Sequence, residues 1–123
     1  MDALALLGRL LMSAIFIQGG VGKALAPGAT IAMMARDGLP LPEVGWVVAV
    51  LIELAGGTLF LVGYRARPMA LVLAAWCIAT ALVAHLHPGD RNQMIHFMKN
   101  VCMAGGFLQV AAFGAGRFRL GRT

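Results

Sequence analysis

The chain has 123 residues, enough for one small domain, and 60% of them are hydrophobic whereas only 12% are charged. Soluble domains average roughly 45–50% apolar and about 25% charged residues. This chain has too few charged side chains to cover the surface of a soluble fold, and its mean hydropathy is +0.83. The net charge of +5 does not indicate nucleic-acid binding, because the basic residues flank apolar segments instead of forming one stripe. The composition predicts an integral membrane protein with the lipid bilayer as its partner and no nucleic acid.

Four apolar segments follow one another, at residues 3–25, 44–63, 69–86 and 94–114. Each has about 18–23 residues, enough to cross a hydrocarbon core of roughly 30 Å as an α-helix. The segments are too long for strands and do not alternate between apolar and polar residues. Residues 69–83 offer only Thr80 as a clearly polar side chain, so they lack the polar face of a soluble bundle helix. We predict a single domain, residues 1–123, that folds as an all-α, integral membrane four-helix bundle.

The first segment has one feature of a secretory signal peptide, because Ala24-Leu25-Ala26 fits a small-residue cleavage site. However, no basic region precedes it, and Arg9 and Gln18 interrupt its apolar run. We interpret residues 3–25 as a retained membrane span.

The connection between the first two spans, residues 26–43, is the longest. Within it, residues 29–37 are predicted to form a short helix lying at the membrane interface. Gly38 would end this helix, and the two prolines at positions 40 and 42 favour an extended entry to the second span.

The basic residues predict the orientation of the chain, because cytoplasmic loops of membrane proteins are rich in Lys and Arg. An even number of spans places both termini and the loop between spans two and three on one side. That side carries most of the arginines, namely Arg9, Arg65, Arg67, Arg117, Arg119 and Arg122. The opposite side has Arg36 and Arg91 together with three of the five acidic residues. We predict cytoplasmic termini in the cytoplasmic (inner) membrane of a bacterium.

The cysteines and histidines give no sign of a metal or disulfide site. Cys77 and Cys102 lie in apolar runs outside any C-x-x-C motif, and they are interpreted as small packing residues. Whether they approach each other is left open. The three histidines include no pair spaced i, i+4, so no metal site is predicted.

Polar residues inside apolar spans are costly, at roughly 2.5–3.5 kcal/mol for a charge at the centre, and therefore indicate a function or a partner. His96, Lys99 and Asn100 share one helix face at spacing i, i+3, i+4. With the termini inside, most such residues fall in the outer half of the bundle. We predict a ligand-binding pocket there, formed by Gln18, Glu53, His96, Lys99 and Asn100.

Three charged residues are candidates for structural pairing: Arg9, Lys23 and Glu53. Helix rise places Arg9 and Lys99 at comparable distances from the level of Glu53. We favour Arg9 as the partner of Glu53, since its guanidinium reaches further and Lys99 would then be free for a ligand. Two alternatives stay open: the charges fix helix packing and nothing else, or Glu53 relays protons.

Nearly the whole chain resembles the DoxX-like family of small bacterial membrane proteins. The resemblance rests on five motifs in order: Gly8-Arg9-Leu10-Leu11, Gly19-Gly20-Val21-Gly22-Lys23, Gly38-Leu39-Pro40, Glu53-Leu54-Ala55-Gly56-Gly57, and Asn92-Gln93-Met94-Ile95-His96-Phe97-Met98-Lys99-Asn100. It implies a four-helix membrane bundle. It also implies a quinone-linked redox setting, because relatives are named for a subunit of an archaeal quinol oxidase complex with thiosulfate-oxidising activity.

The sequence contains no haem, Fe–S, flavin or nucleotide fingerprint. Any redox centre would therefore be a bound quinone or belong to a partner protein. Our leading hypothesis is an accessory, non-catalytic subunit that binds a quinone-like molecule and forms a homodimer or joins another membrane subunit. The alternatives are a small transporter in which Glu53 titrates, and a purely structural membrane partner; no catalytic residue is assigned.

Overall fold

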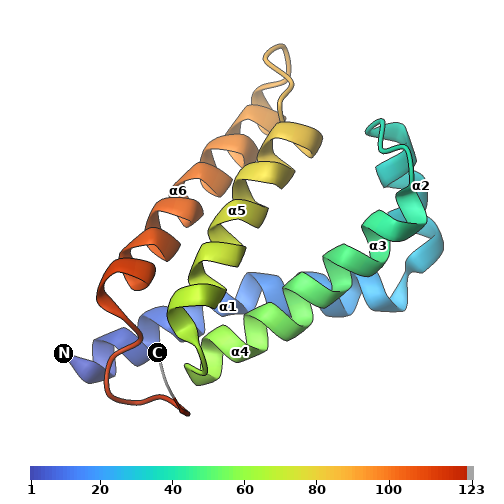
Figure 1. Ribbon diagram of the computed structural model, residues 1–123. Coiled ribbons are helices and arrows are strands. Elements are labelled where there is room, and N and C mark those ends of the chain that lie inside the picture. Colours follow the sequence, from blue (N-terminus) through green and yellow to red (C-terminus); the bar gives the residue numbers. More distant parts are fainter. Residues whose placement is uncertain (122–123) are drawn as a thin grey trace.

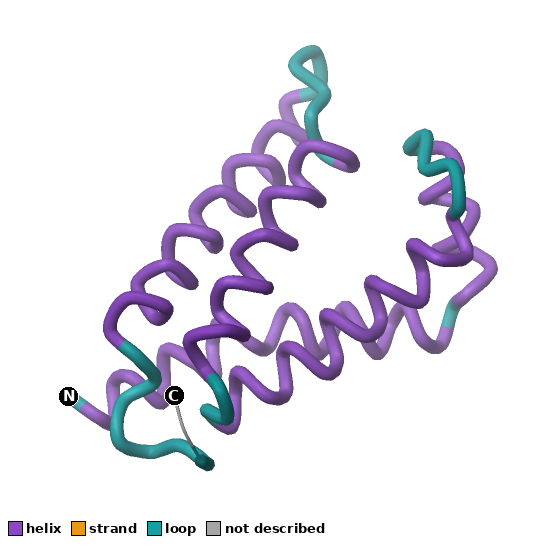
Figure 2. The backbone as a smooth tube through the Cα atoms, in the orientation of Figure 1, coloured by secondary structure: helices purple, strands orange, loops and turns teal. Residues whose placement is uncertain are grey.

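The computed structural model describes residues 1–121, and within them every regular element is a helix (Figures 1 and 2). The elements in order are α1 (Asp2–Leu25), α2 (Pro27–Arg36), α3 (Pro42–Val50), the π-helical turn η1 (Leu51–Gly56), α4 (Gly57–Val62), α5 (Ala66–Ala84) and α6 (Arg91–Phe113). The backbone stays helical from α3 through η1 to α4, so Pro42–Val62 is one continuous rod, hereafter the α3–α4 rod.

Three of the long helices are long and apolar enough to cross a membrane: α1, the α3–α4 rod and α5. Helix α6 has 23 residues and matches them in length, but its first half carries most of the polar side chains of the fourth predicted span. The predicted short helix after the first span is present as α2, and Gly38 follows it with a positive φ of 89°.

The helices form two hairpins that meet at one end and diverge at the other (Figure 1). Helix α1 pairs with the α3–α4 rod, and α5 pairs with α6. The N-terminus and the described segment after α6 lie where the hairpins meet, which we name the terminal end. Helix α2 and the α5–α6 loop lie at the opposite, open end (Figure 2).

The apolar core lies where the two hairpins meet. Phe107 of α6 is fully buried and makes edge-on contacts with Phe16 of α1 and Phe60 of α4, at ring-centroid distances of 5.5 and 5.0 Å. The cluster also contains Ala70, Leu73, Ala74 and Cys77 of α5 and Ala104 of α6. The cluster extends from the terminal end to the level of Glu53, because its members Phe16 and Cys77 also line a pocket beside that carboxylate.

The segment after α6 is bonded to the end of α4 and to α1. Past Gly114 the chain folds back, and the amide of Leu120 donates to the Val62 carbonyl at 2.8 Å. Arg9 is 1% exposed, and its guanidinium donates to the Leu61 carbonyl at 2.5 Å and to the Phe118 carbonyl. Arg9 therefore ties α1 to the end of α4 and to the C-terminal segment.

Close packing of α1 on the α3–α4 rod depends on Gly20. A Cβ at this position would lie 2.7 Å from Leu54 Cγ and 3.0 Å from the Leu54 amide nitrogen, whereas a Cβ at Gly22 would meet nothing within 4 Å. We expect Gly20→Ala to lower the free energy of unfolding by about 1–3 kcal/mol through overpacking. Gly22→Ala is the matched control and should cost nothing. Thermal unfolding in mild detergent measures both, and equal effects would contradict this packing.

Candidate functional site

A part-buried ion pair joins α1 to η1. The Lys23 ammonium is 2.9 Å from Glu53 Oε1, and the Trp76 indole donates to Oε2 at 3.2 Å. The Glu53 side chain is 7% exposed and that of Lys23 26%. Both carboxylate oxygens thus have a donor, and this is the one ion pair formed among residues 1–121.

The geometry of α1 explains why Lys23 reaches Glu53. Side chains on a helix tilt toward its N-terminus, so Lys23, in the last turn of α1, extends back toward the middle of the span. Gly19, one turn earlier, provides the space. A Cβ at position 19 would lie only 2.8 Å from Glu53 Oε1 and 3.5 Å from Lys23 Nζ.

Glu53 lies in the π-helical turn η1. A π-turn inserts an extra residue into a helix, rotates the side chains around it and frequently marks a functional site. Gly56 ends the turn and Gly57 begins α4, and both glycines are buried. The site therefore combines an irregular backbone with a charged side chain at the centre of a span.

A small polar pocket adjoins the ion pair. It has a volume of about 190 Å³ and lies between α1, η1, α5 and α6. Asn100 Nδ2 donates to Thr80 Oγ1 at 3.0 Å and to the Cys77 carbonyl at 3.3 Å, which binds α6 to α5 at this level. The lining residues are Ile15, Phe16, Gly19, Lys23, Glu53, Cys77, Thr80, Asn100 and Met103.

A larger cleft of about 520 Å³ opens between the hairpins toward the open end, and it shares Lys23 and Thr80 with the small pocket. Its walls are mostly apolar and come from α2, α3 and α5, including Met33, Met34, Leu39, Val48, Ala79 and Val83. Its polar outer rim includes His85, whose Nδ1 lies 2.7 Å from Gln93 Oε1. Its volume falls within the range of roughly 300–1,000 Å³ that is usual for small-molecule sites.

The expected pairing of Glu53 with Arg9 is wrong. Arg9 also leans toward the N-terminus of α1, which carries its guanidinium away from Glu53 and onto the carbonyls of the terminal end. Lys99 does not bind Glu53 either; the donors to this carboxylate are Lys23 and Trp76.

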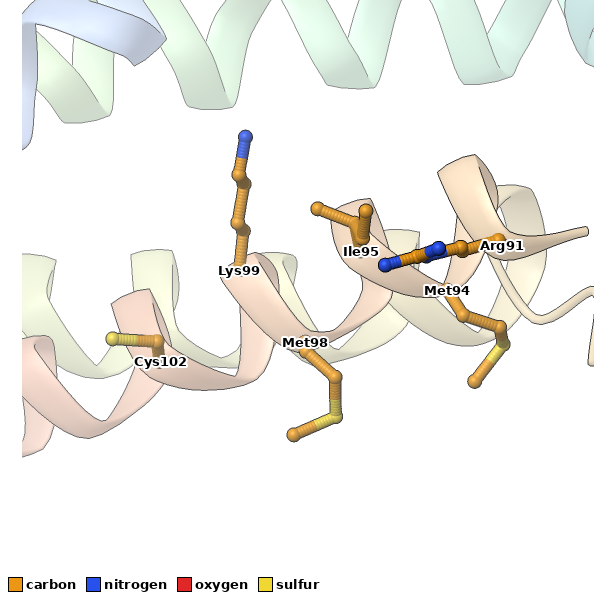
Figure 3. A pocket seen from close by; sticks show the side chains of 6 residues that line it. All are labelled: Arg91, Met94, Ile95, Met98, Lys99 and Cys102. Atoms are coloured by element: carbon orange, nitrogen blue, oxygen red, sulfur yellow. The ribbon is translucent and has the colours of Figure 1, made fainter.

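The structure brings Glu53 and Asn100 together but not the other three residues predicted for the ligand pocket. Gln18, His96 and Lys99 are exposed and line neither the small pocket nor the cleft. The centroid of the His96 ring lies 5.4 Å from that of His85, with the two rings tilted by 32°. Lys99 lies in a shallow groove on α6 (Figure 3).

Sequence reasoning missed Trp76 and Thr80, since neither is charged. It named Lys23 for charge pairing without choosing it as the partner of Glu53, although the spacing Gly19-x-x-x-Lys23 was a usable signal. Cys77 is buried at the small pocket and Cys102 is exposed, and both are free thiols.

The fold and these features define a multi-pass membrane protein with an internal polar site. Residues 4–86 match the DoxX family. The chain is 34% identical to inner membrane protein YphA of Escherichia coli (strain K12), over 97% of this chain and 89% of that protein. It is also 34% identical to inner membrane protein YqjF of the same organism, over 98% of this chain and 92% of that protein. No solved structure matches the chain significantly. The chain belongs to the DoxX family of inner membrane proteins.

Proposed function

We propose that this protein is an accessory subunit of a quinone-linked redox complex and that its cleft holds the head of a quinone-like molecule. The observation that carries the proposal is that Lys23 and Thr80 line both the apolar cleft of about 520 Å³ and the polar pocket beside Glu53. A molecule with a flat polar head and an apolar tail matches such a site at both ends.

We also propose that the termini are cytoplasmic, because arginines predominate at the terminal end. A reporter enzyme that is active only outside the cytoplasm, fused to the C-terminus, should therefore be inactive.

The side chains present fit a quinone head. Its carbonyl oxygens accept hydrogen bonds, and the Lys23 ammonium uses one of its three N–H groups on Glu53, leaving two for a ligand. Trp76 and Val48 offer flat and apolar walls next to Lys23, and Met33 and Met34 adapt to an isoprenoid tail. A bound quinone would supply reversible electron and proton uptake. The chain itself would bind, orient and desolvate the head, while the electrons come from a partner protein.

Quinone retention tests the proposal. We expect the wild-type protein, extracted from membranes in mild detergent, to carry ubiquinone or menaquinone, measured by chromatography of the organic extract. Val83→Trp fills the cleft without changing the ion pair and should reduce the retained quinone at least about tenfold. A tenfold loss corresponds to about 1.4 kcal/mol of binding free energy. Leu82→Trp is the matched control, because Leu82 is exposed and does not line the cleft.

Retention that is unchanged in Val83→Trp, or wild-type protein that is repeatedly quinone-free, would overturn the proposal. The thermal stability of both tryptophan variants should equal that of the wild type, which separates lost binding from lost folding.

A transporter is the second candidate, favoured by one observation: a buried carboxylate in a π-helical turn next to two buried glycines. Such a site suits a titrating group in a helix that bends. This function would be favoured if wild-type protein carried a small molecule into liposomes and Glu53→Gln abolished that flux.

A further inference from the structure

The terminal end carries a basic surface that the proposed function does not use. It consists of Arg65 and Arg67, at the start of α5, and of Arg117 and Arg119, in the segment after α6; we name these four residues the arginine surface. All four side chains are exposed. Among residues 1–121 none of the four forms an ion pair with a carboxylate.

The fold brings the two parts of this surface together. Figure 1 shows the segment after α6, in red, passing the turn between α4 and α5. In that turn Gly63 lies directly against Arg119, since a Cβ added to Gly63 would be 2.5 Å from the Arg119 Cβ. The Tyr64 ring contacts Gly121 at its edge, and the Arg65 guanidinium lies over it at 5.9 Å from the centroid. Arginines that are far apart in the sequence therefore share one surface.

Hydrogen bonds to backbone atoms hold the segment after α6 in place. The Arg117 amide donates to Asp2 Oδ1 at 3.1 Å. The Phe118 carbonyl accepts from Arg9. The Leu120 amide donates to the end of α4 at 2.8 Å. Because backbone atoms make these three contacts, the side chains of the segment stay exposed on a fixed support, which lowers the ordering cost of binding a ligand.

The two ends of the bundle differ in charge. At the open end Arg36 and Arg91 each have an aspartate as a direct neighbour, and Glu43 lies in the first turn of α3. The terminal end has Arg9 and the four residues of the arginine surface. Among residues 1–121, Asp2 provides the only side-chain carboxylate at that end. The excess of positive charge at the terminal end attracts an anion.

The ends of three helices place this surface at the level of lipid headgroups. Helix α1 begins at Asp2, the α3–α4 rod ends at Val62 and α5 begins at Ala66, and each is long and apolar enough to cross a membrane. A bilayer crossed by these three helices ends near this level, whatever the position of α6. Phe118 and Leu120 alternate with the arginines and are 52% and 64% exposed. Acyl chains cover such apolar side chains, whereas a soluble acidic peptide would meet only the charges.

We propose that the arginine surface binds the phosphate of an anionic phospholipid, whose acyl chains lie against Phe118 and Leu120. Phosphatidylglycerol is an anion, whereas the ammonium of phosphatidylcholine cancels the charge of its phosphate, so the surface prefers the former. A guanidinium donates to two phosphate oxygens at once, which suits arginine to this role. The surface is separate from the cleft and binds lipid on whichever side the termini lie, so this proposal and the proposed function stand or fall independently.

Lipid selectivity tests the proposal. The full chain, in micelles with equal amounts of phosphatidylglycerol and phosphatidylcholine, is analysed by native mass spectrometry, which counts the retained lipids of each kind. We expect the wild type to prefer phosphatidylglycerol by about tenfold. The double variant Arg117→Gln, Arg119→Gln should lower this preference at least about fivefold. The matched control, Arg36→Gln with Arg91→Gln, removes the same charge at the open end and should keep it.

A conservative variant separates charge from folding. Arg119 Nη1 donates to the Gly116 carbonyl at 2.6 Å, so replacing it removes one contact within the segment. The double variant Arg117→Lys, Arg119→Lys loses the same guanidinium contact but keeps both charges, and it should retain most of the preference. The glutamine and lysine variants should melt at the same temperature in micelles that contain phosphatidylcholine alone.

Four results would contradict a lipid site at the arginine surface. The first is equal retention of the two lipids by the wild type, and the second is a preference that survives the glutamine variant. The third is an equal loss in the Arg36 and Arg91 control, which would assign the preference to net charge alone. The fourth is displacement of bound phosphatidylglycerol by hexaglutamate or by inorganic phosphate, which would assign the surface to an acidic protein segment or to a free anion.

Discussion

Replacing Arg9 by methionine is expected to lower the free energy of unfolding by about 3 kcal/mol. The guanidinium is almost completely buried and donates to the carbonyls of Leu61 and Phe118, so its removal leaves two part-buried acceptors without this donor. Hydrogen bonds to a charged donor are worth roughly 1.5–3 kcal/mol each, and unsatisfied buried acceptors add a penalty. Methionine keeps most of the volume, which isolates the polar loss. Unfolding of the purified protein in mixed micelles measures the change.

Two further variants test whether the Arg9 hydrogen bonds cause the loss of stability. Arg9→Lys keeps the charge but not the fork that reaches both carbonyls, so an intermediate loss is expected. Arg67→Met removes an exposed arginine from the same end of the bundle and should change stability by no more than about 0.5 kcal/mol. If Arg9→Met were as stable as Arg67→Met, the guanidinium would not be holding the C-terminal segment.

Replacing Lys23 by methionine is expected to cost a similar amount, about 3 kcal/mol. The carboxylate of Glu53 would stay buried with only the Trp76 indole as a donor. Removing the charge as well should restore stability, so the double variant Lys23→Met, Glu53→Gln is expected to be more stable than Lys23→Met alone. Lys99→Met is the control, since that ammonium pairs with no carboxylate among residues 1–121. A single Lys23 variant with wild-type stability would contradict the pairing.

The helices could be predicted from sequence because hydropathy over about twenty residues reports membrane burial directly. The same reasoning identified Glu53 as a residue that needs a partner, since an apolar span offers a carboxylate no solvent. It also placed a short helix after the first span, where α2 lies. These features depend on local composition and on the cost of burying a charge.

The pairing of the charges could not be predicted by counting helix rise. Rise gives the level of a Cα atom, whereas the lean of side chains toward the helix N-terminus moves the Arg9 and Lys23 head groups in the same direction along α1. That lean separates Arg9 from Glu53 and brings Lys23 to it. The π-helical turn also changes the direction of Glu53, and nothing in the composition of residues 51–56 signals it.

The divergence of the two hairpins also could not be predicted from the sequence. Gln18, His96 and Lys99 would converge in a parallel bundle of the predicted helices. In the structure the phenylalanine cluster joins the hairpins near the terminal end, and the polar halves of α1 and α6 carry exposed side chains instead. Helix positions do not reveal which end of a bundle is closed, because that depends on how the side chains of different helices fit together.

A double-mutant cycle at positions 23 and 53 tests most directly whether Lys23 neutralises Glu53 inside the membrane. The stabilities of wild type, Lys23→Met, Glu53→Gln and the double variant are measured in the same micelles, and a parallel cycle uses Arg9→Met with Glu53→Gln. We expect a coupling of about 2 kcal/mol for Lys23 with Glu53, within the usual range for contacting residues, and about zero for Arg9 with Glu53. A coupling confined to the Arg9 cycle, or absent from both, would contradict the central ion pair.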